Sequence, residues 1–412
     1  MSRWGSGFST FSRGLLLHGN IRVLAFTSMV TGLYISMLNT VLQPFVVTGF
    51  GLSMLGILQS VGSRPSGLAS SIVQPFAGLF ADLVGRKQLI VIGSAVAICS
   101  MVSFFTVTIT HSLPVLALAY ILFGLSLMSS PASQAMVAES VSMDPAKLDV
   151  AFSVIFFFTQ VPGALAAFAG GFIADAFGYY VIFGAAAVLE FANLVCLISF
   201  LRETGGDHRP AEGSRGSDSF SIKQVIRLPP GFLRFFTPFA MDAFSYGIAG
   251  SIIYGMWVRQ FGYSSGDIGV IVGTLSISIV VCQYPATKFL RMVGTRRCLA
   301  FSEFLTVVVM LGWATTGSLP VFILLSVVFG LSVATWVPAL QSFLMVNAPP
   351  EERGSMGGKL AAVRGLIAFP APIIGSLLFN FYGYYLPVTL GLIGEAFTTL
   401  AILRLLPKTS GQ

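Results

Sequence analysis

Twelve long apolar runs constrain the fold of this chain more than any other feature of its sequence. About 20 consecutive apolar residues in an α-helix cross the ~30 Å hydrocarbon core of a bilayer. Only 9% of the residues are charged, whereas an ordinary soluble domain carries about 25%. The sequence therefore predicts an all-α integral membrane protein with twelve transmembrane helices and lipid as its main solvent. The runs lie at residues 21–47, 54–82, 88–110, 114–139, 149–174, 179–201, 232–258, 267–292, 298–317, 319–346, 355–381 and 385–406.

Lysine and arginine residues lie mostly on one side of these runs, and this bias predicts the orientation. With both termini in the cytoplasm, all but two of the 23 bases fall on the cytoplasmic side, and the exceptions are Arg64 and Arg259. Short cytoplasmic loops carry an excess of Lys and Arg. We expect a multi-pass protein of the plasma or inner membrane. Its net charge of +7 then reflects topology and not nucleic-acid binding.

The two sets of six runs repeat each other. Ser112-Leu113-Pro114-Val115 recurs 206 residues later as Ser318-Leu319-Pro320-Val321. Between the sets, residues 202–231 are charged, glycine-rich and poor in large apolar side chains, as expected of a flexible linker. We therefore expect an N-terminal six-helix bundle over residues 1–201 and a C-terminal one over 232–412. Parallel repeats of this kind bracket a central site in transporters.

The loop between the second and third runs carries the most specific pattern. It reads Gly78-Leu-Phe-Ala-Asp82-Leu-Val-Gly85-Arg86-Lys87 and closely resembles the signature Gly-x-x-x-Asp-x-x-Gly-Arg-Lys of the major facilitator superfamily. Gly78 lets helices approach closely, and Gly85 permits a tight turn. Together with the span count, the linker and the duplication, the resemblance covers the whole chain. It implies the major facilitator fold, with two pseudo-symmetric six-helix bundles.

The resemblance also implies a role for the charges of this loop. Asp82 and Arg86, with Lys87 beside them, would form a charge relay with an acid at the cytoplasmic end of the fourth run, where Glu139 stands. The relay would latch the two halves in the outward-facing state and break when the protein reopens inward. The alternative is that these bases only mark topology, because bases flank most spans.

Two departures leave the subclass open. Proton-coupled drug exporters of the family usually carry an arginine in span four, four residues before a glycine. This chain has Tyr120 at that spacing before Gly124. In span five, those exporters carry Gly-Pro-x-x-Gly-Gly, whereas this chain reads Gln160-Val-Pro162-Gly163-Ala-Leu-Ala-Ala.

Ionisable residues inside the spans are candidate binding residues, because a charge in lipid is costly unless it faces a cavity or a partner. Asp242 lies about ten residues into the seventh run, with Tyr246, Tyr254 and Trp257 on the same helical face. This stripe could hold a lipophilic cation or a coupling proton. The alternative is an acid that only bonds a neighbouring helix.

The arginines and other polar residues inside the spans complete the candidate cavity. Arg64 either faces the cavity mouth or snorkels to the interface, and Arg364 either binds an anionic group or anchors its helix. Glu190 and Glu395 occupy equivalent repeat positions, which predicts an inherited architectural role. The serines of span four are read as small packing residues. The other cavity candidates are Tyr34, Asn39, Gln160, Trp336 and Gln341.

No convergent catalytic residues, histidine cluster or phosphate-binding loop stand out in the sequence. We therefore expect no enzyme activity, cofactor or metal site. The favoured function is a monomeric secondary transporter whose partners are membrane lipid, a small-molecule substrate and protons as coupling ion. Efflux of amphipathic, drug-like compounds is weakly favoured over import of a sugar or organic anion. A receptor or scaffold that kept the fold without transport is the alternative from another class.

Overall fold

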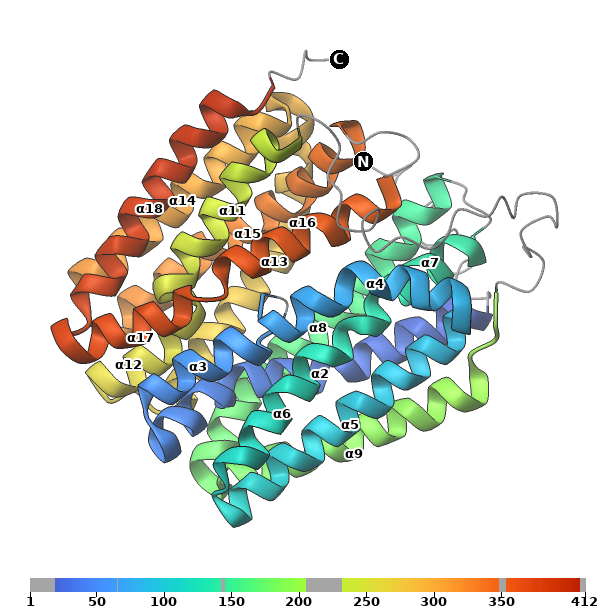
Figure 1. Cartoon of the computed structure of the whole chain (residues 1–412), viewed down its shortest axis with the longest axis horizontal. Helices are drawn as coiled ribbons and strands as arrows, with labels where there is room; N and C mark the ends of the chain where they lie inside the picture. Colours follow the sequence, from blue (N-terminus) through green and yellow to red (C-terminus); the bar gives the residue numbers. More distant parts are fainter. Residues whose placement is uncertain (1–18, 65, 142–144, 205–231, 348–352, 408–412) are drawn as a thin grey trace, which may run out of the picture.

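The computed structural model describes residues 19–64, 66–141, 145–204, 232–347 and 353–407. These residues form helices and no β-strand. Figure 1 shows the helices from the first half of the sequence, blue to green, on one side, and those from the second half, yellow to red, on the other. The first half contains α2 (Gly19–Phe50), α3 (Leu52–Gly62), α4 (Leu68–Val84), α5 (Arg86–Thr110), α6 (Leu113–Leu125), η1 (Ser126–Met128), α7 (Ser129–Ser140), α8 (Pro145–Phe177) and α9 (Tyr179–Phe200). The second half contains α11 (Phe232–Ala249), η2 (Gly250–Ile252), α12 (Ile253–Phe261), α13 (Ser265–Val293), α14 (Thr295–Thr315), α15 (Leu319–Asn347), α16 (Arg353–Ala368), α17 (Ala371–Tyr382) and α18 (Tyr385–Leu405).

The predicted all-α membrane fold is confirmed. Ten helical segments of the described residues are long and apolar enough to cross a membrane. The two other predicted spans are each divided between shorter helices, α3 with α4 and α11 with α12. The domain boundaries at 201 and 232 stay a prediction, because residues 205–231 lie outside the described part of the chain.

Tight glycine turns define the two ends of the helix bundle. The α4–α5 turn at Gly85 has φ +107°, and the α8–α9 turn at Gly178 has φ +89°. Only glycine adopts such angles without a steric penalty. Because successive spans alternate in direction, these turns lie at opposite ends. We call the end with Gly85 the motif end and the end with Gly178 the far end.

Several spans are interrupted, and local chemistry explains where. In the fourth span, the hydroxyls of Ser126 and Ser129 donate to the carbonyls of Phe123 and Ser126 at 2.7 and 3.1 Å. Such bonds compete with the helical ladder and bend helices, and a short 3₁₀ turn lies here. Between α16 and α17, Pro370 has no N–H for the ladder.

Glycines bring the helices into backbone contact. A side chain on Gly32 of α2 would collide with the carbonyl of Thr159 on α8, and one on Gly375 of α17 would collide with the carbonyl of Ile248 on α11. Between the halves, Gly171 of α8 meets the backbone of Ser265 on α13 in the same way. Small residues allow this close packing, which drives helix association in lipid.

The Gly32 contact predicts a difference between two glycines of the same helix. Gly32→Ala should lower the melting temperature, because overpacking against a rigid backbone costs about 1–3 kcal/mol. Gly49→Ala is the control, since a methyl group there meets nothing within 4 Å. Thermal unfolding of the purified variants measures this, and equal effects would contradict the packing argument.

Candidate functional site

An ion pair at the motif end joins two of the residues that the sequence singled out. Arg86 Nε and Nη2 lie 3.1 and 3.0 Å from Glu139 Oε1. The Thr204 hydroxyl donates to Glu139 Oε2 at 2.5 Å. Lys87 Nζ donates to the carbonyl of Ile198 on α9 at 2.9 Å. The predicted Arg86–Glu139 contact is therefore present, while the side chain of Asp82 lies outside the described part.

Glu203 is a motif-end residue that the sequence reasoning counted only as linker. Its carboxylate accepts the backbone N–H groups of Arg86 and Lys87 at 3.1 and 3.0 Å. These are first-turn N–H groups of α5, which have no partner within their own helix, and a carboxylate there is stabilised by the helix dipole. The residues after α9 are thereby attached to the start of α5.

At the far end, hydrogen bonds join the two halves. Asp175 of α8 accepts the backbone N–H groups of Ser265 and Gly266 at 3.0 and 2.7 Å. Gln43 of α2 donates to the Ser251 carbonyl at 3.0 Å and accepts from the Gly255 N–H at 2.9 Å. We call these four bonds the far-end latch. They are individually modest, so the interface they close is one that can reopen.

The far-end latch and the Arg86–Glu139 pair predict opposite effects on a cysteine probe. Ser376 is 1% exposed on α17, where it faces Gly56 of α3. In a background without the native cysteines, Asp175→Ala should speed labelling of Ser376→Cys by a water-soluble maleimide, because it loosens the far end. Arg86→Ala should slow it, because loosening the motif end favours closure of the far end.

The control for this probe is Asp267→Asn. Asp267 caps the same helix α13 through Ser264, three residues earlier: its carboxylate accepts the Ser264 N–H at 2.9 Å, and its own backbone N–H donates to the Ser264 hydroxyl at 3.1 Å. It should leave the labelling rate unchanged. Equal rates in all variants would show that these contacts do not set the balance between the two ends.

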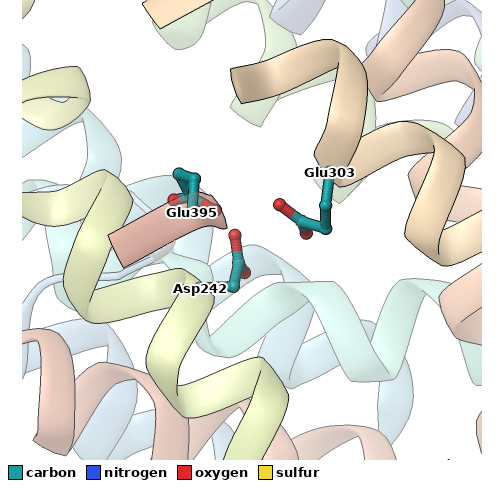
Figure 2. A group of neighbouring side chains, drawn as sticks. All are labelled: Asp242, Glu303 and Glu395. Atoms are coloured by element: carbon teal, nitrogen blue, oxygen red, sulfur yellow. The ribbon is translucent and has the colours of Figure 1, made fainter. Parts of the chain in front are cut away.

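Three carboxyl groups meet inside the second half, as Figure 2 shows. Asp242 comes from α11, Glu303 from α14 and Glu395 from α18, and one oxygen of each lies within 4.8 Å of the others. The three residues are 9%, 2% and 0% exposed. Arg364 of α16 donates from Nη2 to Asp242 Oδ2 at 2.5 Å and from Nε to the Phe239 carbonyl at 3.2 Å. We call this group the carboxyl cluster with its arginine.

Small residues allow the helices that carry this cluster to approach closely. Gly391 and Gly394 of α18 pack against Ser245 of α11, so the two helices approach closely and Glu395 faces Asp242. The hydroxyls beside Glu303 are engaged elsewhere: Ser302 donates to the Ser332 carbonyl on α15 at 2.8 Å, and Thr306 shares a 3.0 Å bond with the Ser332 hydroxyl.

The ion pair changes the interpretation of two predicted residues. Asp242 and Arg364 appeared in the sequence as separate candidates for a cation and an anion, and the structure joins them to each other. Arg364 keeps 29% of its side chain exposed and lies over the Trp336 ring at 5.9 Å. Arg364 is therefore the partly exposed member of the group, and the three carboxyl groups behind it are buried.

Removing Arg364 should destabilise the protein more than neutralising Asp242. Arg364→Gln leaves three carboxyls without a cation, whereas Asp242→Asn leaves Arg364 beside two others. We expect Arg364→Gln to cost about 3–5 kcal/mol, typical of a broken buried pair, and Asp242→Asn less. The loss should grow as pH rises, because the orphaned acids then need protons that are scarcer. Melting temperatures at several pH values measure this, with exposed Arg291→Gln as control.

The predicted aromatic stripe beside Asp242 is only partly present. Tyr246 stacks on Phe329 with ring centroids 5.9 Å apart. Trp257 instead lies 1% exposed in the core, stacked on Phe322 at 4.5 Å and bonded to the Tyr384 hydroxyl at 3.0 Å. The 3₁₀ turn η2 winds more tightly than an α-helix, so it shifts the helical phase after Ala249. The single projection that aligned Trp257 with Asp242 was therefore wrong.

The first half contains a partly open polar cavity of about 230 Å³. Arg64, Tyr34 and Glu190 line it, and Tyr34 interacts electrostatically with both charges. Ser94 and Asn193 donate to Glu190 at 2.5 and 3.0 Å. Arg64 faces this cavity and also lies over the Phe123 ring at 5.0 Å. Arg64 therefore lines this cavity, and its role in binding stays a prediction.

The remaining residues that the sequence singled out lie in different parts of the structure. The four serines of span four line the cavity, which was the alternative to a pure packing role; they are Ser126, Ser129, Ser130 and Ser133. Asn39 and Gln341 lie exposed on α2 and α15, and Gln160 is half-buried on α8. Glu395 lies in the carboxyl cluster together with Glu303, a residue that the sequence reasoning did not single out. The architectural role of Glu395 stays a prediction.

An apolar groove of about 410 Å³ lies between α11 and α16. Phe236, Met241 and Phe244 of α11 line it, together with Val363 and Ile367 of α16. Val363 directly precedes Arg364 in the chain. The helix α16, which carries the partly exposed Arg364, therefore also lines an apolar surface.

The family profile described as Major Facilitator Superfamily matches residues 24–372, and again residues 235–412. Multi-drug resistance efflux pump PmrA of Streptococcus pneumoniae is 23% identical over 370 residues, 89% of this chain and 90% of that protein. Multidrug resistance protein 1 of Bacillus subtilis is 26% identical over 91% of this chain and 95% of its own length. Quinolone resistance protein NorA of Staphylococcus aureus is 26% identical over 85% and 86%.

Solved structures share the fold at lower identity. The nucleoside transporter NupG aligns with a TM-score of 0.67 and 14% identity over 93% of this chain and 97% of that one. The human organic anion transporter MFSD10 aligns with a TM-score of 0.68 and 15% identity over 93% and 99%.

Proposed function

The chain belongs to the Major Facilitator Superfamily, and we propose that it is a secondary active transporter that moves a small solute by alternating access. The observation that carries this proposal is the set of charged side chains inside both halves: Arg64 and Glu190 in the first, Asp242 and Arg364 in the second. Such residues at membrane depth are costly and mark substrate or ion pathways. A receptor or scaffold would gain nothing from them.

Reversible contacts at both ends support the alternating-access part of the proposal. The far-end latch would hold one entrance shut, and the Arg86–Glu139 pair would act in the relay that holds the other. We propose that the motif end is cytoplasmic, because the positive-inside rule puts Arg86, Lys87 and both termini there.

The substrate we propose is an amphipathic compound moved outward in exchange for protons. The apolar groove between α11 and α16 supports this choice, because flexible Met and aromatic side chains accept varied apolar shapes. The relatives named as multidrug efflux pumps support it from sequence. Asp242 is neutralised by Arg364, so recognition would rest on the groove more than on that carboxylate.

Import of a sugar or organic anion remains the second candidate, and Arg64 in its hydroxyl-lined cavity favours it. A thermal-shift panel of lipophilic cations, sugars and organic anions on the purified protein separates the two. Stabilisation by lipophilic cations supports export. Stabilisation only by sugars or anions, lost in Arg64→Ala, would replace export with import.

The groove predicts a change in affinity at one aromatic residue. Phe244→Ala should weaken binding of a lipophilic cation about tenfold or more, since burying a Phe side chain contributes about 1.5–3 kcal/mol. The control is Phe304→Ala, because Phe304 is 54% exposed on α14, away from the groove. Tryptophan-fluorescence titration measures both affinities, and an unchanged affinity in Phe244→Ala would exclude the groove.

A further inference from the structure

We propose that Glu303 and Glu395 form the site where this transporter binds its coupling proton. The inference rests on the proposed function, because a coupling proton has meaning only in a transporter. It assigns the proton to two glutamates on α14 and α18, whereas the sequence named Asp242 as one candidate for either a lipophilic cation or a coupling proton. Neither glutamate was expected to take part in transport.

The position of Glu395 is the first step of the argument. Its side chain is 0% exposed, and neither carboxyl oxygen has a hydrogen-bond donor. One of these oxygens lies within 4.8 Å of an oxygen from each of the other two carboxyl groups of the cluster (Figure 2). A buried polar group without a partner costs about 1–3 kcal/mol, and more when it is charged. A proton between Glu395 and Glu303 removes this cost, because one carboxyl group then donates to the other.

The charges of the cluster lead to the same conclusion. Three ionised carboxylates and one arginine would leave two uncompensated negative charges in an apolar interior. The groups that face the site are Asp242 and Tyr246 from α11, Glu303 from α14, Arg364 from α16 and Glu395 from α18. The span α15 has no ionisable residue. One proton leaves a single negative charge, and a second proton makes the cluster neutral, so the site has two states that differ by one proton.

A proton fits this site better than a metal ion. Ca²⁺ takes about six to eight oxygen ligands, and Mg²⁺ requires an octahedral set. The cluster offers three carboxyls, of which Asp242 already accepts from Arg364. The hydroxyls of Ser302 and Thr306 are committed to α15. A proton needs only two oxygens, and the two glutamates supply them.

Proton binding can affect the interface between the two halves through Arg364. When the second proton binds, a carboxylate becomes a carboxylic acid, and the attraction that holds Arg364 against the cluster weakens. Arg364 lies on α16 next to Gly365, and Gly365 packs against Ser71 of α4 in the other half. A change in the hold on Arg364 therefore acts on a helix that touches both halves.

Infrared difference spectroscopy of the reconstituted protein at two pH values tests the site without any substrate. The wild type should show the C=O band of a buried carboxylic acid, shifted in heavy water. Glu395→Gln and Glu303→Gln should each lose this band, because an amide replaces one partner of the shared proton. The Asp267→Asn control, at the start of α13 and outside the cluster, should keep it. A band that persists in both glutamine variants would overturn the proposal.

Vesicle transport of a fluorescent lipophilic cation gives the second readout. In Glu395→Gln and in Glu303→Gln, export driven by a pH gradient should be lost, while exchange of labelled for unlabelled dye without a gradient continues. Gradient-driven export that survives in both variants would refute the proton site and leave the transporter assignment intact. Absence of export and exchange in the wild type would instead refute the proposed function.

Added cations distinguish a metal site from a proton site. The melting temperature of the wild type should not rise with Na⁺ or Ca²⁺ at constant ionic strength. A rise that disappears in Glu395→Gln would assign the cluster to a metal ion and overturn the proton proposal. Glutamine closely matches glutamate in shape and mimics its protonated form, so these variants are expected to fold.

Discussion

The buried ion pair between Asp242 and Arg364 shows the constraint under which the whole molecule is built. Lipid provides no hydrogen bonds and little dielectric screening, so each charge inside the bundle must find compensation from another helix. Arg364 compensates Asp242 on α11, and Ser94 and Asn193 solvate Glu190 in the first half. Close helix packing at glycines makes these distances attainable. The close helix contacts, the interrupted helices and the polar cavity all relate to this need to compensate polar groups inside the bundle.

Duplication gave the two halves equivalent positions, and the positions have diverged in chemistry. Glu190 and Glu395 correspond in the repeat, 205 residues apart. Glu190 receives two hydrogen bonds from neutral side chains and borders a polar cavity. Glu395 receives none and faces other acids. The two equivalent glutamates thus differ: the carboxylate of Glu190 is hydrogen-bonded by neighbouring side chains, whereas that of Glu395 faces other carboxyl groups without a donor.

The fold and part of the site could be predicted from the sequence. Features set by local sequence were predictable, and features set by the way helices cross were not. Span length depends on a local pattern, so the helices were anticipated from the residues themselves. The Arg86–Glu139 contact was anticipated only because the loop resembles the signature of the family. Glu303 has an equally legible signal, an acid within an apolar run, but no motif or repeat partner drew attention to it. Trp257 was misplaced because one helical projection was carried through η2, where the pitch changes. The pairing of Asp242 with Arg364 depends on how α11 and α16 cross, and no local pattern encodes that crossing.

Gln43 has a further consequence for the way the far end opens. Its amide uses both of its ends, accepting from the first turn of α12 and donating to the carbonyl of Ser251 in η2. These backbone groups lie where the seventh span is interrupted, so the helix itself leaves them unpaired. When α2 moves away, only water can take the place of the amide, because lipid and apolar side chains cannot. Opening therefore requires hydration of a break in a helix, and osmotic pressure becomes a variable that acts on the conformational balance of the protein.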